Sequence, residues 1–201
     1  DTKIKEMLSL KKSLNILRKT DALLEGHFVL SSGLHSSKYI QCAKLLSYPH
    51  LAEKICKSLA RKIKKNFSKF DLILSPAMGG IIIGYEIGRI LKKETIFCER
   101  VGGKFALRRG FKIRKGSKVI IIEDVITTGK SSIECVKLIK KAKAKLVGFA
   151  SIIDRSNKKN LKIKNKIISH LKIDVPVFNK KQIPKSLKII PITTPGSRFT
   201  K

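Results

Sequence analysis

Acidic and aromatic side chains are scarce in this chain of 201 residues. Only 14 residues are Asp or Glu against 45 Lys or Arg, so the formal net charge is +31, and the aromatic residues are nine Phe and three Tyr with no Trp. Such a charge attracts polyanions at low salt. The lysines are nevertheless spread along the whole sequence, and no aromatic residues interleave with a basic stripe as base stacking would require. We therefore expect no dedicated nucleic-acid partner, and keep a nucleic-acid-binding regulator as the alternative from another functional class.

Cysteine and histidine are also few, with four residues of each type. The cysteines contain no C-x-x-C pair and are far apart in sequence: Cys42, Cys56, Cys98 and Cys135. The spacing argues against a zinc or redox centre and favours free thiols in a reducing cytoplasm. The histidines do not cluster either, so neither a metal site nor a catalytic histidine is expected: His27, His35, His50 and His170.

Long hydrophobic runs are missing as well. The longest, such as residues 119–122, are far shorter than the roughly 20 residues that a helix needs to cross a bilayer. The first residues are charged and show no apolar core of a signal peptide. Hydrophobic residues still make up 42% of the chain, which is enough for a core. We expect a cytoplasmic protein with one domain, residues 1–201, and no membrane partner.

Hydrophobic periodicity predicts an α/β fold. Amphipathic helices are expected within residues 3–18 and 50–65, and a pair of strands at 26–33 and 38–41. Short apolar strands then alternate with helices: strands at 70–74, 95–98, 118–122 and 145–153, helices at 80–92 and 131–143. Residues 104–113 are expected to form a mobile hairpin or loop, and 124–131 a loop. This alternation is typical of a central parallel sheet covered by helices on both faces.

The most informative stretch follows the apolar strand at 119–122. Two adjacent acids, Glu123 and Asp124, stand at its carboxyl end, followed by Thr127-Thr128-Gly129 and the start of a helix. Ligands of open α/β sheets bind at this edge. Backbone amides from Thr128 to Ser132, at a helix N-terminus, suit a phosphate. The acids would repel a phosphate but can accept hydrogen bonds from sugar hydroxyls, so the pattern predicts a sugar-phosphate ligand.

Two better-known phosphate motifs do not fit this stretch. Gly129-Lys130-Ser131 is similar to the end of a Walker A loop, but that motif needs glycine where Asp124 stands. The G-x-G-x-x-G spacing of a dinucleotide site is absent too. An ordinary β–α turn with two exposed acids is the remaining alternative.

Residues 119–132 resemble the phosphoribosyl-diphosphate signature of the type I phosphoribosyltransferase family. Four further segments resemble, more narrowly, its orotate phosphoribosyltransferases: residues 28–36, 75–80, 99–111 and 153–156. The resemblance implies the type I phosphoribosyltransferase fold, with a small hood (about 1–48 plus part of the C-terminal segment) and a core of about 49–156. It implies transfer of phosphoribose from phosphoribosyl diphosphate to orotate, in the synthesis of pyrimidine nucleotides. It also implies a Mg²⁺ cofactor held mainly by substrate and water, with no metal ligand from a side chain.

The resemblance assigns roles residue by residue. Glu123 and Asp124 would hold the ribose hydroxyls and favour a cationic transition state. The phosphoribosyl-diphosphate site would also include Val125, Ile126, Thr127, Thr128, Gly129, Lys130 and Ser131. Orotate would contact Thr127, Arg155, Tyr39 and Ile40. A guanidinium such as that of Arg155 suits the orotate carboxylate because it can form two parallel hydrogen bonds.

A basic segment, residues 100–109, completes the expected site. Its cations are Arg100, Lys104, Arg108 and Arg109, with Gly102-Gly103 as a hinge. By resemblance it reaches across a homodimer with shared active sites, and Arg100 and Lys104 join the acids as catalytic residues, with Lys104 stabilising the leaving pyrophosphate.

Several positions depart from the pattern of many relatives. Those relatives carry Lys where Ser31 and Val101 stand, Tyr-Lys where Met78-Gly79 stands, and a loop His near Ala106. Which cation of the basic segment has which role is therefore left open. A purine phosphoribosyltransferase is the alternative that keeps the fold and changes the base.

Overall fold

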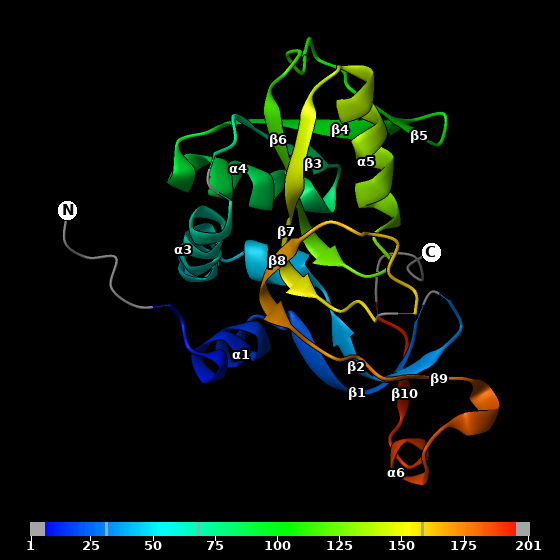
Figure 1. Ribbon diagram of the computed structural model, residues 1–201. Coiled ribbons are helices and arrows are strands. Elements are labelled where there is room, and N and C mark those ends of the chain that lie inside the picture. The colour runs from blue at the N-terminus through cyan, green and yellow to red at the C-terminus, as the bar shows by residue number, and fades with distance from the viewer. Residues whose placement is uncertain (1–6, 31, 68, 158, 196–201) are drawn as a thin grey trace.

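The computed structural model describes residues 7–30, 32–67, 69–157 and 159–195, and its centre is a six-stranded sheet in the order β5-β4-β3-β6-β7-β8 (Figure 1). The strands are β3 (Leu72–Pro76), β4 (Glu94–Val101), β5 (Lys104–Ala106), β6 (Lys118–Ile126), β7 (Lys145–Asp154) and β8 (Ile167–Lys172). All neighbours run parallel except β5, which forms an antiparallel hairpin with β4. The carboxyl ends of the parallel strands therefore lie at one edge of the sheet.

Helices cover both faces of this core sheet. α3 (Pro49–Asn66) and α4 (Gly79–Leu91) pack on one face and α5 (Lys130–Lys141) on the other. The alternation along β6 shows why: Ile120 and Ile122 belong to the core under α3 and α4, whereas Val119 and Ile121 belong to the core under α5. Successive side chains of a strand point to opposite faces, so a strand buried on both faces has to be apolar throughout.

A second, smaller sheet forms the hood, in the order β10-β1-β2-β9. Its strands are β1 (Leu23–Val29), β2 (His35–Ile40), β9 (Val177–Phe178) and β10 (Ile192–Thr193), so both ends of the chain contribute to it. The remaining elements are α1 (Leu10–Lys19), α2 (Cys42–Leu46), η1 (Lys180–Gln182) and α6 (Lys185–Lys188). Figure 1 shows the hood below the core sheet, at the carboxyl ends of β6 and β7.

Local signals in the sequence explain several boundaries. The hydroxyl of Ser9 caps α1 by accepting a hydrogen bond from the Lys12 amide, at 3.3 Å. α3 begins at Pro49, whose fixed backbone angle and missing amide proton suit the first position of a helix. The α/β interpretation is confirmed, and the strands and helices expected from residue 26 to 153 are present.

Three segments differ from expectation or extend it. The strand expected to end at residue 122 continues to Ile126, because Glu123, Val125 and Ile126 still pair with β7, so only residues 127–129 form the loop. β8 joins the core sheet beyond the expected limit at about 156. The first part of the helix expected within 3–18, up to residue 6, lies outside the described residues, as does Ser31. No helix in the described ranges is long and apolar enough to cross a membrane.

Candidate active site

The carboxyl end of β6 places two acids in a sheltered position. Glu123 is 9% exposed and Asp124 is half-buried, and β6 pairs with β3 on one side and β7 on the other. Acids inside a sheet are costly, since burial disfavours their charged form. Two of them in succession, at the edge where ligands of such sheets bind, indicate a functional site.

Glu123 turns toward the helix that follows it. The hydroxyl of Ser132, in the first turn of α5, donates a hydrogen bond to one carboxylate oxygen, and Ser132 itself is fully buried. Burial raises the pKa of the Glu123 carboxyl to about 7, against a lowering by the Ser132 hydrogen bond and a further increase from Asp124. Glu123 is therefore a carboxyl group that changes charge near neutral pH in the ligand-free protein.

Asp124 faces a glycine on the neighbouring helix. A Cβ atom at Gly79 would lie 2.7 Å from one carboxylate oxygen of Asp124, so only glycine leaves room for this side chain. The other oxygen accepts a hydrogen bond from the Val125 amide at 2.9 Å. Burial raises the pKa of Asp124, and backbone hydrogen bonds oppose the increase. Gly79 and Asp124 thus bring the start of α4 to the same edge as the end of β6.

The loop after β6 leads directly into a helix N-terminus. Gly129 caps α5 with a φ of 73°, a left-handed conformation, and a Cβ at this position would lie 2.6 Å from Ile163. Thr127 and Thr128 are exposed, and the Thr128 carbonyl accepts a hydrogen bond from Lys162 at 2.9 Å. Amides in the first turn of a helix have no acceptor within the helix and carry partial positive charge. This turn can bind a phosphate next to Glu123 and Asp124.

The hood brings an aromatic residue to the same edge. Tyr39, on β2, lies within electrostatic range of Arg155, which directly follows β7. Burial lowers the pKa of Arg155, and Tyr39 opposes this effect. The Arg155 amide donates to the Ile126 carbonyl at 3.0 Å, which ties the arginine to the end of β6. Ile40, which was expected to contact orotate, is 8% exposed and packs in the hydrophobic core.

The basic segment lies on the outer side of α5. Arg100 pairs with Glu134 of α5 at 2.8 Å and packs over the ring of Phe105, 4.1 Å from its centre. Both Arg108 and Arg109 pair with Glu99, while Lys104 is exposed at the start of β5. The β4–β5 hairpin projects beyond α5, away from the body of the chain (Figure 1). The structure therefore groups the acids, the phosphate loop, Tyr39 and Arg155, and leaves the basic hairpin reaching outward.

Two side-chain pairs were missed at the level of sequence. His27 and His35, expected not to cluster, are buried with ring nitrogens 2.7 Å apart, because β1 and β2 are antiparallel neighbours. The sulfurs of Cys98 and Cys135 lie 3.3 Å apart although 37 positions separate them. All four cysteines are free thiols. Within the described part of the chain, no group of three or more His, Cys, Asp or Glu side chains is placed to hold a metal ion.

Comparison with known proteins gives consistent matches. The family described as "Phosphoribosyl transferase domain" matches residues 46–182. The chain is 44% identical, over 94% of its length and 97% of the relative, to orotate phosphoribosyltransferase of Caldicellulosiruptor saccharolyticus. It is 45% identical, with the same coverage, to that of Parvibaculum lavamentivorans.

Solved structures extend the likeness to the fold. Orotate phosphoribosyltransferase from Aeropyrum pernix superposes with a TM-score of 0.67 at 21% identity, covering 79% of this chain and 92% of the other. Adenine phosphoribosyltransferase from Thermoanaerobacter pseudethanolicus gives a TM-score of 0.59 at 18% identity, covering 68% and 88%. At these identities the superpositions establish the architecture and leave the choice of base to the sequence relatives.

Proposed function

The chain belongs to the phosphoribosyltransferase family, within its orotate phosphoribosyltransferases, and on this premise we propose that the carboxyl end of β6 is its active site. The reaction transfers the 5-phosphoribosyl group from phosphoribosyl diphosphate to orotate, giving orotidine 5′-monophosphate and pyrophosphate for pyrimidine synthesis. The observation that carries the assignment of the site is the juxtaposition of two sheltered acids with a helix N-terminus on one strand–loop–helix unit.

The loop and the first turn of α5 bind the phosphate of the ligand, and the acids at the end of β6 bind its ribose. The first-turn amides of α5 and the hydroxyls of Thr127, Thr128 and Ser131 bind the 5′-phosphate. Glu123 and Asp124 accept hydrogen bonds from the ribose hydroxyls. Departure of pyrophosphate leaves positive charge on the ribose ring, and a carboxylate fixed close by stabilises that charge without having to reorganise.

Orotate occupies the side formed by the hood. Arg155 pairs with the orotate carboxylate, and Thr127 contacts the ring. Tyr39, within electrostatic range of Arg155, lines the pyrimidine pocket. The half-buried position of Arg155 strengthens the pairing, because charges shielded from water attract one another more strongly. This arrangement aims the orotate nitrogen at the anomeric carbon, and such positioning supplies a large part of the rate.

The residues present fit a Mg²⁺ ion that is held mainly by substrate. The donors near the phosphate loop are hard oxygen atoms, namely two carboxylates and the threonine hydroxyls, and the described residues offer no three-ligand cluster. Glu123 and Asp124 would face a bound ion through the ribose hydroxyls and water. When bound, the ion neutralises the diphosphate and makes it a better leaving group.

A homodimer fits an apolar face on α4. Met78, Ile82 and Tyr85 lie along one side of the helix and are 84%, 55% and 67% exposed. Next to them is a groove of about 480 Å³ lined by Leu46, Pro49, His50 and Ala52, among others. Exposed apolar residues gathered in this way mark interaction surfaces. The face begins one residue before Gly79, so a partner bound there lies beside the active site.

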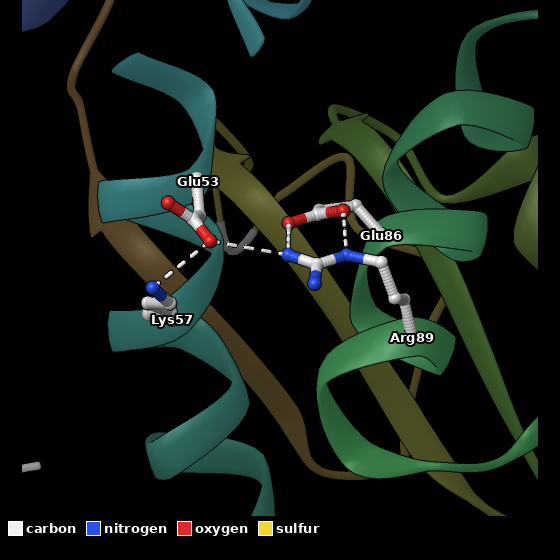
Figure 2. Close-up of polar contacts among 4 residues, drawn as sticks. All are labelled: Glu53, Lys57, Glu86 and Arg89. Carbon is white, nitrogen blue, oxygen red and sulfur yellow. Dashed lines mark hydrogen bonds and ion pairs between the residues drawn. The ribbon is translucent and has the colours of Figure 1, made fainter. Parts of the chain in front are cut away.

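The balanced charges around this face favour a second copy of the chain as its binding partner. Figure 2 shows the polar rim, where Glu53 pairs with Lys57 at 2.9 Å and with Arg89 at 3.2 Å, and Arg89 holds Glu86 at 2.8 Å. The hydrogen bond with Lys57 lowers the pKa of Glu53. Two of the chain's 14 acids, Glu53 and Glu86, therefore lie at this rim, where the charges of Lys57 and Arg89 balance theirs. Two chains of charge +31 repel each other over most of their surface, and this face permits close approach.

In such a dimer, the β4–β5 hairpin, which carries the first part of the basic segment, reaches the active site of the partner subunit. Lys104 is exposed at its tip, and the hairpin extends away from its own phosphate loop (Figure 1). We assign Lys104 and Arg100 to the pyrophosphate of the neighbouring subunit, which a pair of shared active sites requires. We also place the enzyme in the cytoplasm, where the four free thiols stay reduced, and regard residues 1–201 as one catalytic domain.

A panel of bases tests the proposed activity. Purified protein with phosphoribosyl diphosphate and Mg²⁺ should consume orotate and release pyrophosphate, with adenine, hypoxanthine and uracil unused. Turnover of a purine with none of orotate would replace the assignment with a purine phosphoribosyltransferase. No turnover of any base would leave the fold without this function.

A single substitution tests the dimer face. Tyr85→Lys should convert a species of twice the 22.5 kDa chain mass into a monomer in sedimentation velocity, with loss of turnover. Ile189→Lys adds the same charge at an apolar residue that is 84% exposed on the hood, and it should stay dimeric. A wild-type monomer, or a dimer that survives Tyr85→Lys, would contradict the proposed face.

A further inference from the structure

The edge of the core sheet opposite the active site gathers cations from four separate segments. Lys64 and Lys69 lie at and just beyond the end of α3, and Lys92 and Lys93 follow α4. The loop before β6 adds Lys112, Arg114 and Lys115, and the residues after α5 add Lys143 and Lys145. We call these nine residues the basic band. They are dispersed in the sequence, and the fold collects them because every parallel strand begins at this edge.

The band is hollowed and continuous. One depression of about 560 Å³ is lined by Lys92, Lys93, Lys112, Arg114 and Lys115, among others. A second of about 510 Å³ shares Lys92 and Lys93 with it and continues to Lys64 and Lys69. On the far side, the Gly116 amide donates to the Lys143 carbonyl at 3.0 Å, which joins the turn after α5 to the first depression. The surface is therefore an extended track.

Little negative charge within the described residues neutralises the band. Asp71 lies in both depressions but accepts a hydrogen bond from the Lys118 amide at 2.8 Å. Glu94 pairs with Arg114 at 3.1 Å. None of the band's lysines forms an ion pair with a described acid, although Lys93 lies over the Phe70 ring. Cations that are held close together and outnumber the acids beside them are ready to bind an anion.

Two lysines of the band occupy backbone positions that favour glycine. Lys92 and Lys143 have φ values of 53° and 54°, in the left-handed region. In both turns, the next amide reaches back five residues, from Lys93 to Gly88 at 2.9 Å and from Ala144 to Ile139 at 3.1 Å. This is the Schellman motif, whose left-handed residue is usually glycine, and a side chain there costs about 1 kcal/mol. Attraction of cations to helix C-termini does not require these two positions, since the last turns already carry Arg89, Lys140 and Lys141.

From these observations we propose that the basic band binds the phosphate backbone of nucleic acid without base preference. A track of nine cations over four segments matches a line of phosphates better than one small anion. The neighbouring rings of Phe67 and Phe70 are buried, so bases find no stacking partner there and the contacts are to the backbone. The proposal departs from the expectation of no dedicated nucleic-acid partner. The proposal does not depend on the assigned activity, because the band and the phosphate loop lie at opposite ends of β6.

A pair of charge-matched variants tests the band. The Lys92→Gln, Lys112→Gln, Lys115→Gln triple variant removes three exposed band cations, and Lys11→Gln, Lys12→Gln, Lys19→Gln removes three from α1, leaving the same net charge. The probe is a fluorescent 20-nucleotide RNA of mixed sequence, followed by anisotropy from about 50 to 200 mM KCl. The band variant should bind at least tenfold more weakly, and its salt slope should fall by about 2, at about 0.7 per lost phosphate contact. The α1 variant should bind as wild type does, and orotate turnover should be the same in all three.

Three results would overturn the proposal. Equal weakening by both triple variants would show that only total charge matters. Wild-type protein without measurable affinity at 150 mM KCl would show that the band is merely solvated. Equal affinity for poly-glutamate of the same charge would show that the band does not recognise a phosphate backbone.

Discussion

The two ends of β6 show opposite ways of using charge. At the carboxyl end, Glu123 and Asp124 are sheltered from water, and each is held by a specific hydrogen bond. At the amino end, the lysines of the basic band are exposed and, among the described residues, free of ion pairs. A sheltered charge acts strongly and at short range, whereas exposed charges are screened and act as a group. Single substitutions should therefore matter greatly at one end and little at the other.

Removal of the charge of Asp124 should give the largest effect. Asp124→Asn keeps the shape of the side chain but removes the anion that we assign to the ribose, so kcat should fall on the order of 10³-fold. The free energy of unfolding should not fall and should rise slightly near neutral pH, because burial disfavours the charged form that the substitution removes. Asp71→Asn makes the same change at the amino end and should keep full turnover. Pyrophosphate release measures the turnover of both variants. An equal loss of turnover in the two would contradict the difference between the two ends of β6.

Glu123 should make stability depend on pH. Its pKa is about 7 in the folded protein against an ordinary value of 4.5, so the folded state holds the proton more tightly than the unfolded chain does. Stability contributed by this group is therefore present at low pH and is lost as pH rises from about 4.5 through about 7, on the order of 3 kcal/mol in all. Glu123→Gln should be more stable than wild type near pH 8 and equal to it near pH 4.5. Urea denaturation of both proteins at the two pH values measures this. The same difference in free energy of unfolding at pH 8 and pH 4.5 would contradict the prediction.

Lys104 tests whether an exposed cation contributes to catalysis when it lies beside an active site. Lys104→Ala should lower kcat about 100-fold, because it removes the cation that we assign to the leaving pyrophosphate. Mixed with Asp124→Asn subunits, it should recover part of its activity, since a heterodimer contains one site with both residues intact. Lys112→Ala is the control at the other end and should be fully active. Absence of rescue would argue for sites built within one subunit.

The smallest effect is expected at the far end of α5. Lys143→Gly replaces a left-handed lysine with the residue that adopts this conformation without strain, so the protein should gain up to about 1 kcal/mol. Lys141→Gly, inside the last helical turn, should instead lose about 1 kcal/mol. Urea denaturation compares the two. A loss at residue 143 would mean that its side chain contributes to folding.

Most of the architecture could be predicted because it depends on local pattern. The alternation of apolar strands and amphipathic helices indicated the parallel sheet, and the acids before Thr127-Thr128-Gly129 indicated the phosphate loop. The end of β6 was misjudged because Glu123 and Asp124 are unfavourable strand residues, and pairing with β7 overrides that preference.

Contacts between distant segments could not be predicted in the same way. Nothing near Gly79 in the sequence indicates that its missing side chain makes room for Asp124, and Ser132 shows no local sign that it bonds Glu123. The His27–His35 pair and the basic band likewise arise only when strands and loops come together. The one available signal was Met78-Gly79-Gly80, because two glycines at the start of a helix suggest close approach of another group.

The hood has a consequence for how the chain folds as it is made. Its inner strands come from residues 23–40, but its edges, β9 and β10, are among the last described residues, and His27 bonds the Ile190 carbonyl at 3.2 Å. A ribosome therefore delivers the whole core sheet, through β8, before the hood can be completed. The core sheet and the loop after β6 are therefore synthesised before the two strands that complete the hood, β9 and β10.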